Sequence, residues 1–106
     1  MLERALVAAK QAELSVNIFT GRVVSGDQFI SSKDKKKWLV DTFDGTCAEM
    51  EGASIGHVAS LNKIPYLVVR AISDKADDSA EMDYPSFAAM AIDNSVALMT
   101  QFVKLC

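Results

Sequence analysis

The sequence predicts an α/β protein in which helices pack on a partial, mixed sheet. Apolar residues recur at helical spacing near both ends of the chain, short apolar runs lie between the helical patterns, and Gly or Pro marks the changes. Alternating strand and helix patterns are typical of a sheet covered by helices. The 106 residues, half of them hydrophobic, suffice for a single domain over residues 1–106.

The first half of the chain predicts two helices and two strands. Residues 2–14 are rich in Ala, Leu, Glu and Lys, which favours a helix. Residues 16–25 alternate loosely and predict a strand. Ser31 and Ser32 are candidate caps for a helix over 35–43, which Asp44 and Gly45 end with a turn. Residues 46–50 predict a second strand.

The second half predicts two helices around a third strand. Residues 53–61 favour a helix that stops before Pro65, and 66–72 form a near-continuous apolar run, typical of a strand buried on both faces. An acidic loop follows over 73–83. Pro85 suits the first turn of a last helix that begins near Tyr84. Three strands make a narrow sheet, so we expect more chain or a partner chain to cover its edges.

Composition excludes several classes of function. The net charge of −3 gives no reason to expect a nucleic-acid partner, and the basic run over 33–37 predicts a solvated helix start. The charges among the first residues come too early and are too mixed for a secretory signal to be expected there, and no apolar run approaches the ~20 residues that span a bilayer. Cys47 and Cys106 lack metal-site spacing, which favours a reducing cytoplasm. We expect no metal, no cofactor and no membrane partner.

Glu49-Met50-Glu51 is the first candidate for chemistry. At the end of a strand, Glu49 and Glu51 can share one face, with Met50 on the other. Two carboxylates on one face repel, so they need ribose hydroxyls, an arginine or a helix N-terminus as donors. The alternative is that Glu51 only serves the first turn of the next helix, where acids are favoured.

Asp74 is the second candidate, at the carboxyl end of the last predicted strand, where ligands of open α/β sheets collect. A protonated Asp74 could assist departure of a purine in N-glycosidic cleavage, provided that burial or a nearby carboxylate such as Glu51 raises its pKa. Arg70 lies in an apolar run and is expected to pair with an acid. A helix cap or turn is the alternative for Asp74.

Two further side chains have competing interpretations. Phe29 follows the turn at Gly26 and could stack on a base or belong to the core. His57 is expected to lie in the core or to support site residues, and not to bind a metal.

In this order, residues 24–30 (VSGDQFI), 48–53 (AEMEGA) and 69–77 (VRAISDKAD) resemble the C-terminal part of bacterial 5′-methylthioadenosine/S-adenosylhomocysteine nucleosidases. Glu-Met-Glu is shared with the wider purine nucleoside phosphorylase superfamily, whereas the SGDxFI and RAISDxAD pair indicates the nucleosidase. The resemblance covers essentially the whole chain. It implies the C-terminal portion of a nucleoside phosphorylase-like α/β/α fold and release of adenine by hydrolysis, without a cofactor.

The resemblance also implies roles for the residues around the base. Asp74 would protonate adenine at N7, with Ser73 orienting it. Phe29 would stack on the base, and the backbone of Ile30 would bond the adenine edge.

Around the sugar, the resemblance implies that Glu51 binds the ribose hydroxyls and that Met50 packs on the ring. Glu49 would contribute to the same sugar pocket, and Phe87 would line the ligand cavity.

Members of the resembled family are longer, and their N-terminal half supplies the acid that activates water. We therefore expect a C-terminal fragment of a homodimeric parent enzyme, inactive alone. The alternatives are a fragment of a purine nucleoside phosphorylase, or a truncated, non-catalytic chain acting through a partner interface.

Overall fold

The computed structural model describes residues 1–73 and 84–106. The chain divides into two compact units, one made of Met1–Phe19 with Met82–Cys106 and the other of Thr20–Glu81. Each unit combines the segments that lie near one another in space, and the single domain over 1–106 stays a prediction.

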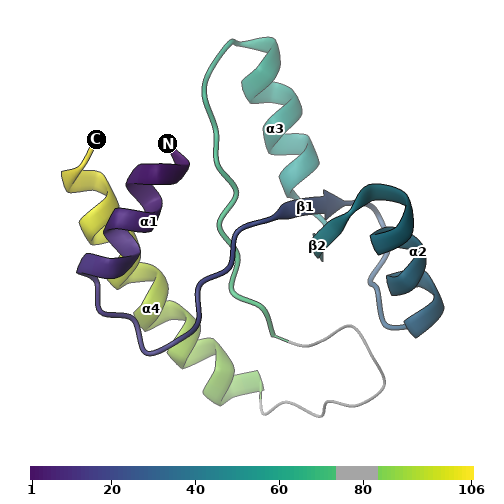
Figure 1. Cartoon of the computed structure of the whole chain (residues 1–106), viewed down its shortest axis with the longest axis horizontal. Coiled ribbons are helices and arrows are strands. Elements are labelled where there is room, and N and C mark those ends of the chain that lie inside the picture. Colours follow the sequence, from purple (N-terminus) through teal and green to yellow (C-terminus); the bar gives the residue numbers. More distant parts are fainter. Residues whose placement is uncertain (74–83) are drawn as a thin grey trace. The chain divides into compact units, whose positions relative to one another are not determined.

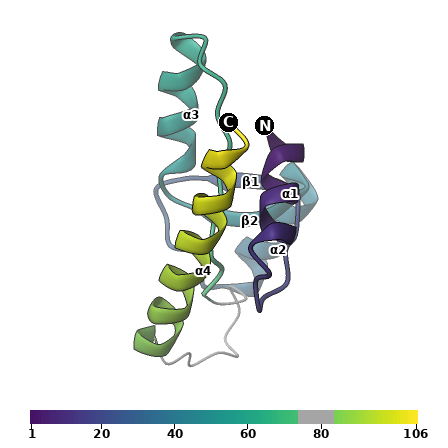
Figure 2. The same ribbon diagram turned by 90° about the vertical axis from the view of Figure 1, so that its left-hand side faces the viewer.

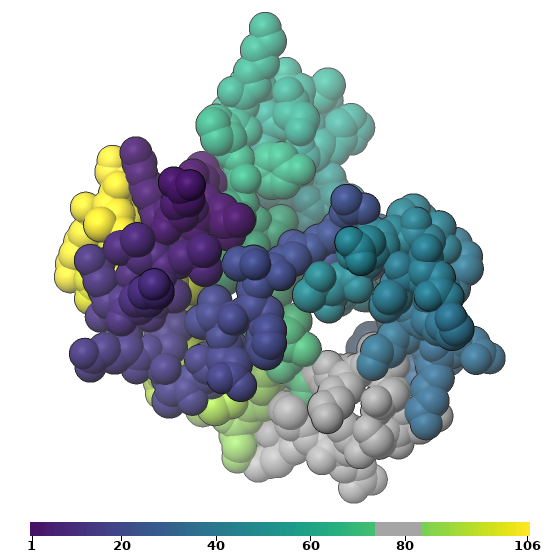
Figure 3. Space-filling view, viewed as in Figure 1, coloured from purple at the N-terminus to yellow at the C-terminus, as the bar shows by residue number. Residues whose placement is uncertain are grey.

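The first unit is a pair of helices from the two ends of the chain, α1 (Leu2–Gln11) and α4 (Tyr84–Lys104). They lie side by side in both ribbon views (Figures 1 and 2), and their atoms are in contact (Figure 3). Ala8 and Ala9 of α1 are buried. Their small side chains let α4 approach α1 closely. Both predicted helices are confirmed, although α1 ends before Leu14. Glu13 has a left-handed backbone (φ 49°), which does not continue a helix.

The second unit contains the only sheet in the described residues, a parallel pair of β1 (Arg22–Ser25) and β2 (Gly45–Glu49). Within residues 1–73 and 84–106, the predicted mixed sheet is therefore a parallel pair. Parallel strands need a crossover connection, and α2 (Lys33–Phe43) provides it (Figure 1). The α/β class is confirmed. Because Ser25 pairs with Glu49, both strands end at the same edge of the sheet.

Local signals fix α2. Ser32 Oγ accepts a hydrogen bond of 3.2 Å from the Lys35 N–H at the N-terminus of the helix. At the other end Asp44 adopts a left-handed conformation and its N–H bonds Val40 O at 2.8 Å. The predicted helix is confirmed and begins two residues earlier, at Lys33. The predicted helix after β2 is also confirmed as α3 (Gly52–Leu61).

The strand predicted over 16–25 is wrong for 16–21, since only Arg22–Ser25 pairs with a neighbour. Loose alternation does not specify a strand without a ladder partner. Just before β1 the chain passes so close to β2 that a Cβ on Gly21 would lie 2.0 Å from Thr46 Oγ1.

The buried strand predicted over 66–72 is also wrong. These residues carry no strand in the described structure, and Tyr66, Val69 and Ile72 are about half exposed. An apolar run becomes a strand only when another strand satisfies its N–H and C=O groups, and the described residues supply none. The segment instead runs back along α3, where the Tyr66 ring lies so close that a Cβ on Gly56 would meet it at 2.9 Å.

His57 on α3 is exposed, so the first of its two expected places, the core, is wrong, and a role in supporting site residues stays a prediction. Among the described helices, none combines the length and apolar character that a bilayer crossing requires.

Candidate functional site

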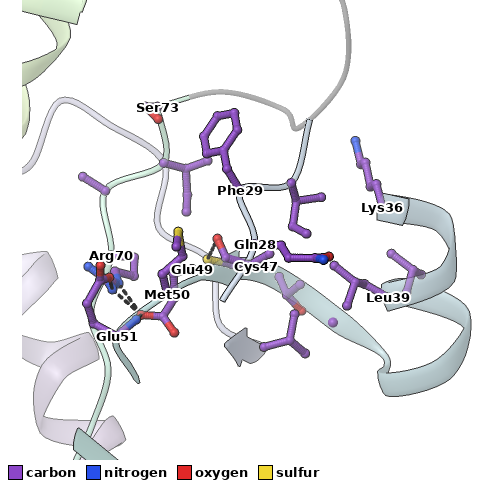
Figure 4. Close-up of a pocket in the computed structure, with 18 residues that line it drawn as sticks. Gln28, Phe29, Lys36, Leu39, Cys47, Glu49, Met50, Glu51, Arg70 and Ser73 are labelled. Atoms are coloured by element: carbon purple, nitrogen blue, oxygen red, sulfur yellow. Dashed lines mark hydrogen bonds and ion pairs between the residues drawn. The ribbon is translucent and has the colours of Figure 1, made fainter. Parts of the chain in front are cut away.

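A pocket of about 500 Å³ opens in the second unit at the carboxyl end of β2. Four segments line it: β1 with the loop after it, one face of α2, β2 with the turn into α3, and residues 70–73 (Figure 4). Six of the predicted site residues are among its lining: Phe29, Ile30, Glu49, Met50, Glu51 and Ser73. Segments far apart in the sequence therefore meet where the motifs predicted a common site.

Two predicted site residues are not placed in this pocket. Asp74 lies outside the described residues, and Phe87 belongs to α4 in the other unit, where its ring lies 6.3 Å from the ring of Tyr84. Their roles stay predictions.

Glu49 is surrounded by donors. Its Oε1 and Oε2 accept hydrogen bonds from the Gly52 N–H at 2.9 and 2.7 Å, and Oε2 accepts one from the Glu51 N–H at 3.2 Å. Arg70 Nε donates to Oε2 at 3.1 Å, and Arg70 Nη2 forms an ion pair with the same oxygen. Only 7% of the Glu49 side chain is exposed.

These donors keep Glu49 ionised. Burial acts to raise the pKa of the carboxyl, but hydrogen bonds from Ser25, Arg70 and the N–H groups of Gly52 and Glu51 outweigh it and lower the pKa from 4.5 to about 2. The pKa of Arg70 is raised in turn by its hydrogen bond to Glu49 and, to a smaller extent, by its hydrogen bond to Glu51. The site therefore carries a fixed network of charges at neutral pH.

Arg70 also forms an ion pair with Glu51, so one guanidinium joins both acids of the motif. The expectation that Arg70 pairs with an acid is confirmed. The sequence left open whether Glu51 serves the first turn of the next helix. In the structure Glu49 accepts the N–H group at the start of α3, whereas the Glu51 side chain makes no cap. The Glu51 side chain is 64% exposed, which leaves its carboxylate accessible to a ligand.

The remaining predicted residues give the pocket an apolar surface. The Phe29 side chain is exposed, and Met50 is about half exposed. In Figure 4 the Arg70–Glu51 contact lies at one end of the drawn residues, and Lys36 and Leu39 of α2 lie at the other.

The lining residues that the sequence did not predict for the site include Lys36, Leu39 and Cys47. Lys36 and Leu39 are three residues apart on α2, so they share one helix face, which was a usable signal. The pKa of Cys47 is raised, mainly by burial and then by Glu49, against the opposing charge of Arg70. Within the described ranges no three His, Cys, Asp or Glu side chains gather closely enough to hold a metal ion.

The amino-acid sequence matches the Phosphorylase superfamily over residues 1–104. The chain belongs to this superfamily. The resemblance inferred from the SGDxFI and RAISDxAD motifs is thereby confirmed at the level of the family, and the α/β fold with its parallel pair fits it.

Individual relatives in this superfamily are nucleosidases by name. The chain is 38% identical to the aminodeoxyfutalosine nucleosidase of Campylobacter jejuni over 103 residues, which is 96% of this chain and 42% of the relative. Against the Helicobacter pylori (strain 26695) aminodeoxyfutalosine nucleosidase it is 35% identical, over 93% of the chain and 43% of the relative.

The 5′-methylthioadenosine/S-adenosylhomocysteine nucleosidase of Treponema pallidum is 39% identical over 79% of the chain and 32% of the relative. The chain thus spans less than half the length of each of these relatives. No solved structure matches the chain significantly.

Proposed function

We propose that the full-length protein is a nucleosidase that hydrolyses the N-glycosidic bond of an adenine nucleoside and releases adenine. The observation that carries this proposal is the pocket of about 500 Å³ in which Phe29 and Glu51 come together from separate motifs. Membership of the superfamily and the names of the relatives support the reaction type.

Glu51 and Met50 are assigned to the sugar. The exposed Glu51 carboxylate can accept hydrogen bonds from ribose hydroxyls, while Arg70 holds it in place. Positive charge develops on the ribose as the glycosidic bond breaks, and a fixed carboxylate next to the ring stabilises that charge. Met50 supplies an apolar contact beneath the ring.

Phe29, Ile30, Ser73 and Asp74 are assigned to the base. The exposed Phe29 ring would stack on adenine, and the Ile30 backbone would bond its edge. Asp74, oriented by Ser73, would protonate N7, so that adenine leaves as a neutral base while water supplies the hydroxyl on the ribose. Phe87 would line the cavity around the same ligand.

The substituent at the ribose 5′ position has two candidates. The motifs resemble enzymes for 5′-methylthioadenosine and S-adenosylhomocysteine, and the Treponema pallidum relative carries that name. Aminodeoxyfutalosine is the second candidate, because the relatives from Campylobacter jejuni and Helicobacter pylori are named for it. The alternative to hydrolysis is a purine nucleoside phosphorylase. In that enzyme phosphate, and not water, would attack the ribose.

Adenine release by the full-length protein tests the proposal. The substrates are 5′-methylthioadenosine, S-adenosylhomocysteine and aminodeoxyfutalosine, each with and without inorganic phosphate, and Glu51→Gln is the control for contaminating activity. We expect release from at least one substrate without phosphate, and much less from the variant. Release that requires phosphate would identify a phosphorylase, and no release from any substrate would overturn the proposal.

The cytoplasm is the proposed location and a homodimer the proposed assembly of the full-length enzyme. Free thiols at Cys47 and Cys106 support a reducing compartment.

A further inference from the structure

We propose that Glu49 is a positioning residue, which fixes Glu51 for the ribose through Arg70 and through the turn into α3, and does not itself bind the sugar. This inference rests on the proposed function, because it gives Glu51 the contact with the ribose. It replaces the sugar contact that the family resemblance implies for Glu49.

The hydrogen-bonding capacity of Glu49 is already used within the protein. An ionised carboxylate offers about four lone-pair sites. Those of Glu49 receive the N–H groups of Gly52 and Glu51 and both Nε and Nη2 of Arg70. With 7% of the side chain exposed, a ribose hydroxyl could reach Glu49 only by displacing one of these donors.

Glu51 is held from two sides by the same carboxylate. Its backbone N–H donates to Glu49 Oε2 at 3.2 Å, and its own carboxylate contacts the Arg70 guanidinium that Glu49 orients. Arg70 meets Glu49 through two nitrogens and Glu51 through one. Both nitrogens converge on the buried Oε2 of Glu49, so Glu49 makes the larger share of the contacts that orient the guanidinium.

Gly52 fits this arrangement. A Cβ at residue 52 would lie 2.7 Å from Glu49 Oε1, so glycine permits the carboxylate to approach the N–H groups that open α3. The result is one buried acid that organises the turn and one exposed acid that remains for the ligand.

A double-mutant cycle in the full-length protein separates positioning from direct contact. kcat and KM are measured for the wild type, Glu49→Gln, Arg70→Gln and the double variant, on the nucleoside that the wild type hydrolyses best. We expect Glu49→Gln to lower kcat/KM by about 10- to 100-fold, since it breaks a charged hydrogen-bond network. In the Arg70→Gln background the same change should cost clearly less, because only the contact with the turn into α3 is left to lose. An equal cost in both backgrounds would overturn the proposal, because a direct sugar contact does not need Arg70.

A nuclear magnetic resonance measurement keeps the inference testable without turnover. In ¹⁵N spectra of the full-length protein, we expect a slowly exchanging Arg70 Nε–H signal in the wild type and in Glu51→Gln, and its loss in Glu49→Gln. A fast-exchanging signal in the wild type, or one that survives Glu49→Gln, would overturn the proposal. A wild type without turnover but with the expected signals would refute the proposed function and leave the position of Glu49 intact.

Discussion

The backbone N–H of Ala53 donates a 3.1 Å hydrogen bond to Ser25 Oγ, so the last residue of β1 holds the first turn of α3. The Ser25 hydroxyl in turn donates to the Glu49 carboxylate, which lies opposite it in the strand register. Ser25 therefore joins the sheet, the helix and the charge network of the site.

Ser25→Ala removes one donor from the Glu49 carboxylate, and we expect the pKa of Glu49 to rise from about 2 toward its ordinary 4.5. Titration of the Glu49 side-chain ¹³C signal measures this change. Ser54→Ala is the matched control, because Ser54 Oγ donates to the Glu51 backbone O at 2.8 Å and not to Glu49. An unmoved midpoint in Ser25→Ala would contradict the role of Ser25.

The free energy of unfolding should fall at acidic pH because of the Glu49 carboxyl. The folded pKa of Glu49, about 2, lies below its ordinary value of 4.5. The stabilisation is therefore complete above pH 4.5 and is lost as the pH falls through 2. We expect the difference in urea midpoint between wild type and Glu49→Gln to be large at pH 6 and small near pH 2. A difference independent of pH would mean that the Glu49 charge does not stabilise the fold.

Asp74→Asn should lower adenine release by about 10²- to 10⁴-fold, because an amide cannot supply the proton that the leaving base needs. Asp78→Asn, an equivalent change in the same acidic segment outside the described residues, is the control and should leave the rate within a few-fold. Near-normal turnover of Asp74→Asn would remove Asp74 from the mechanism.

Phe29→Ala should weaken adenine binding. Stacking of a base on an aromatic ring contributes about 1–3 kcal/mol, so we expect a loss of affinity on the order of 5- to 150-fold in calorimetric titrations. Phe29→Trp, which retains a stacking surface, should keep most of the affinity. Phe19→Ala is the control, since Phe19 is similarly exposed, at 80% against 75%, and lines no part of the pocket. Equal losses in the Phe29→Ala and Phe19→Ala variants would exclude a stacking contact.

Gly21→Ala should destabilise the sheet by about 1–3 kcal/mol, because the new methyl group would overlap the Thr46 side chain of β2. A Cβ on Gly26, at the other end of β1, would meet nothing within 4 Å. Gly26→Ala is therefore expected to leave the free energy of unfolding nearly unchanged. Chemical denaturation of both variants measures the difference, and equal stabilities would contradict the close approach at Gly21.

Features that depend only on residues close together in the sequence were predictable. Ser32 marked the start of α2, and strand alternation placed Glu49 and Glu51 on one face, where both now contact Arg70. The run over 66–72 was not predictable, because a strand needs a ladder partner that no local pattern reveals. Nor could the spacing of the two acids predict which one is buried, since that depends on the turn into α3, whose N–H groups bind Glu49, and on Arg70, 21 residues away.

The pairing of α1 with α4 has a consequence for synthesis of the protein on the ribosome. Ala8 and Ala9 meet α4 only after α4 has emerged from the ribosome, although α1 is made before it. At about 5–20 residues per second, the intervening chain takes several seconds to translate. During that interval α1 lacks the helix that it packs against in this structure, so the contacts between α1 and α4 form late in the translation of this segment.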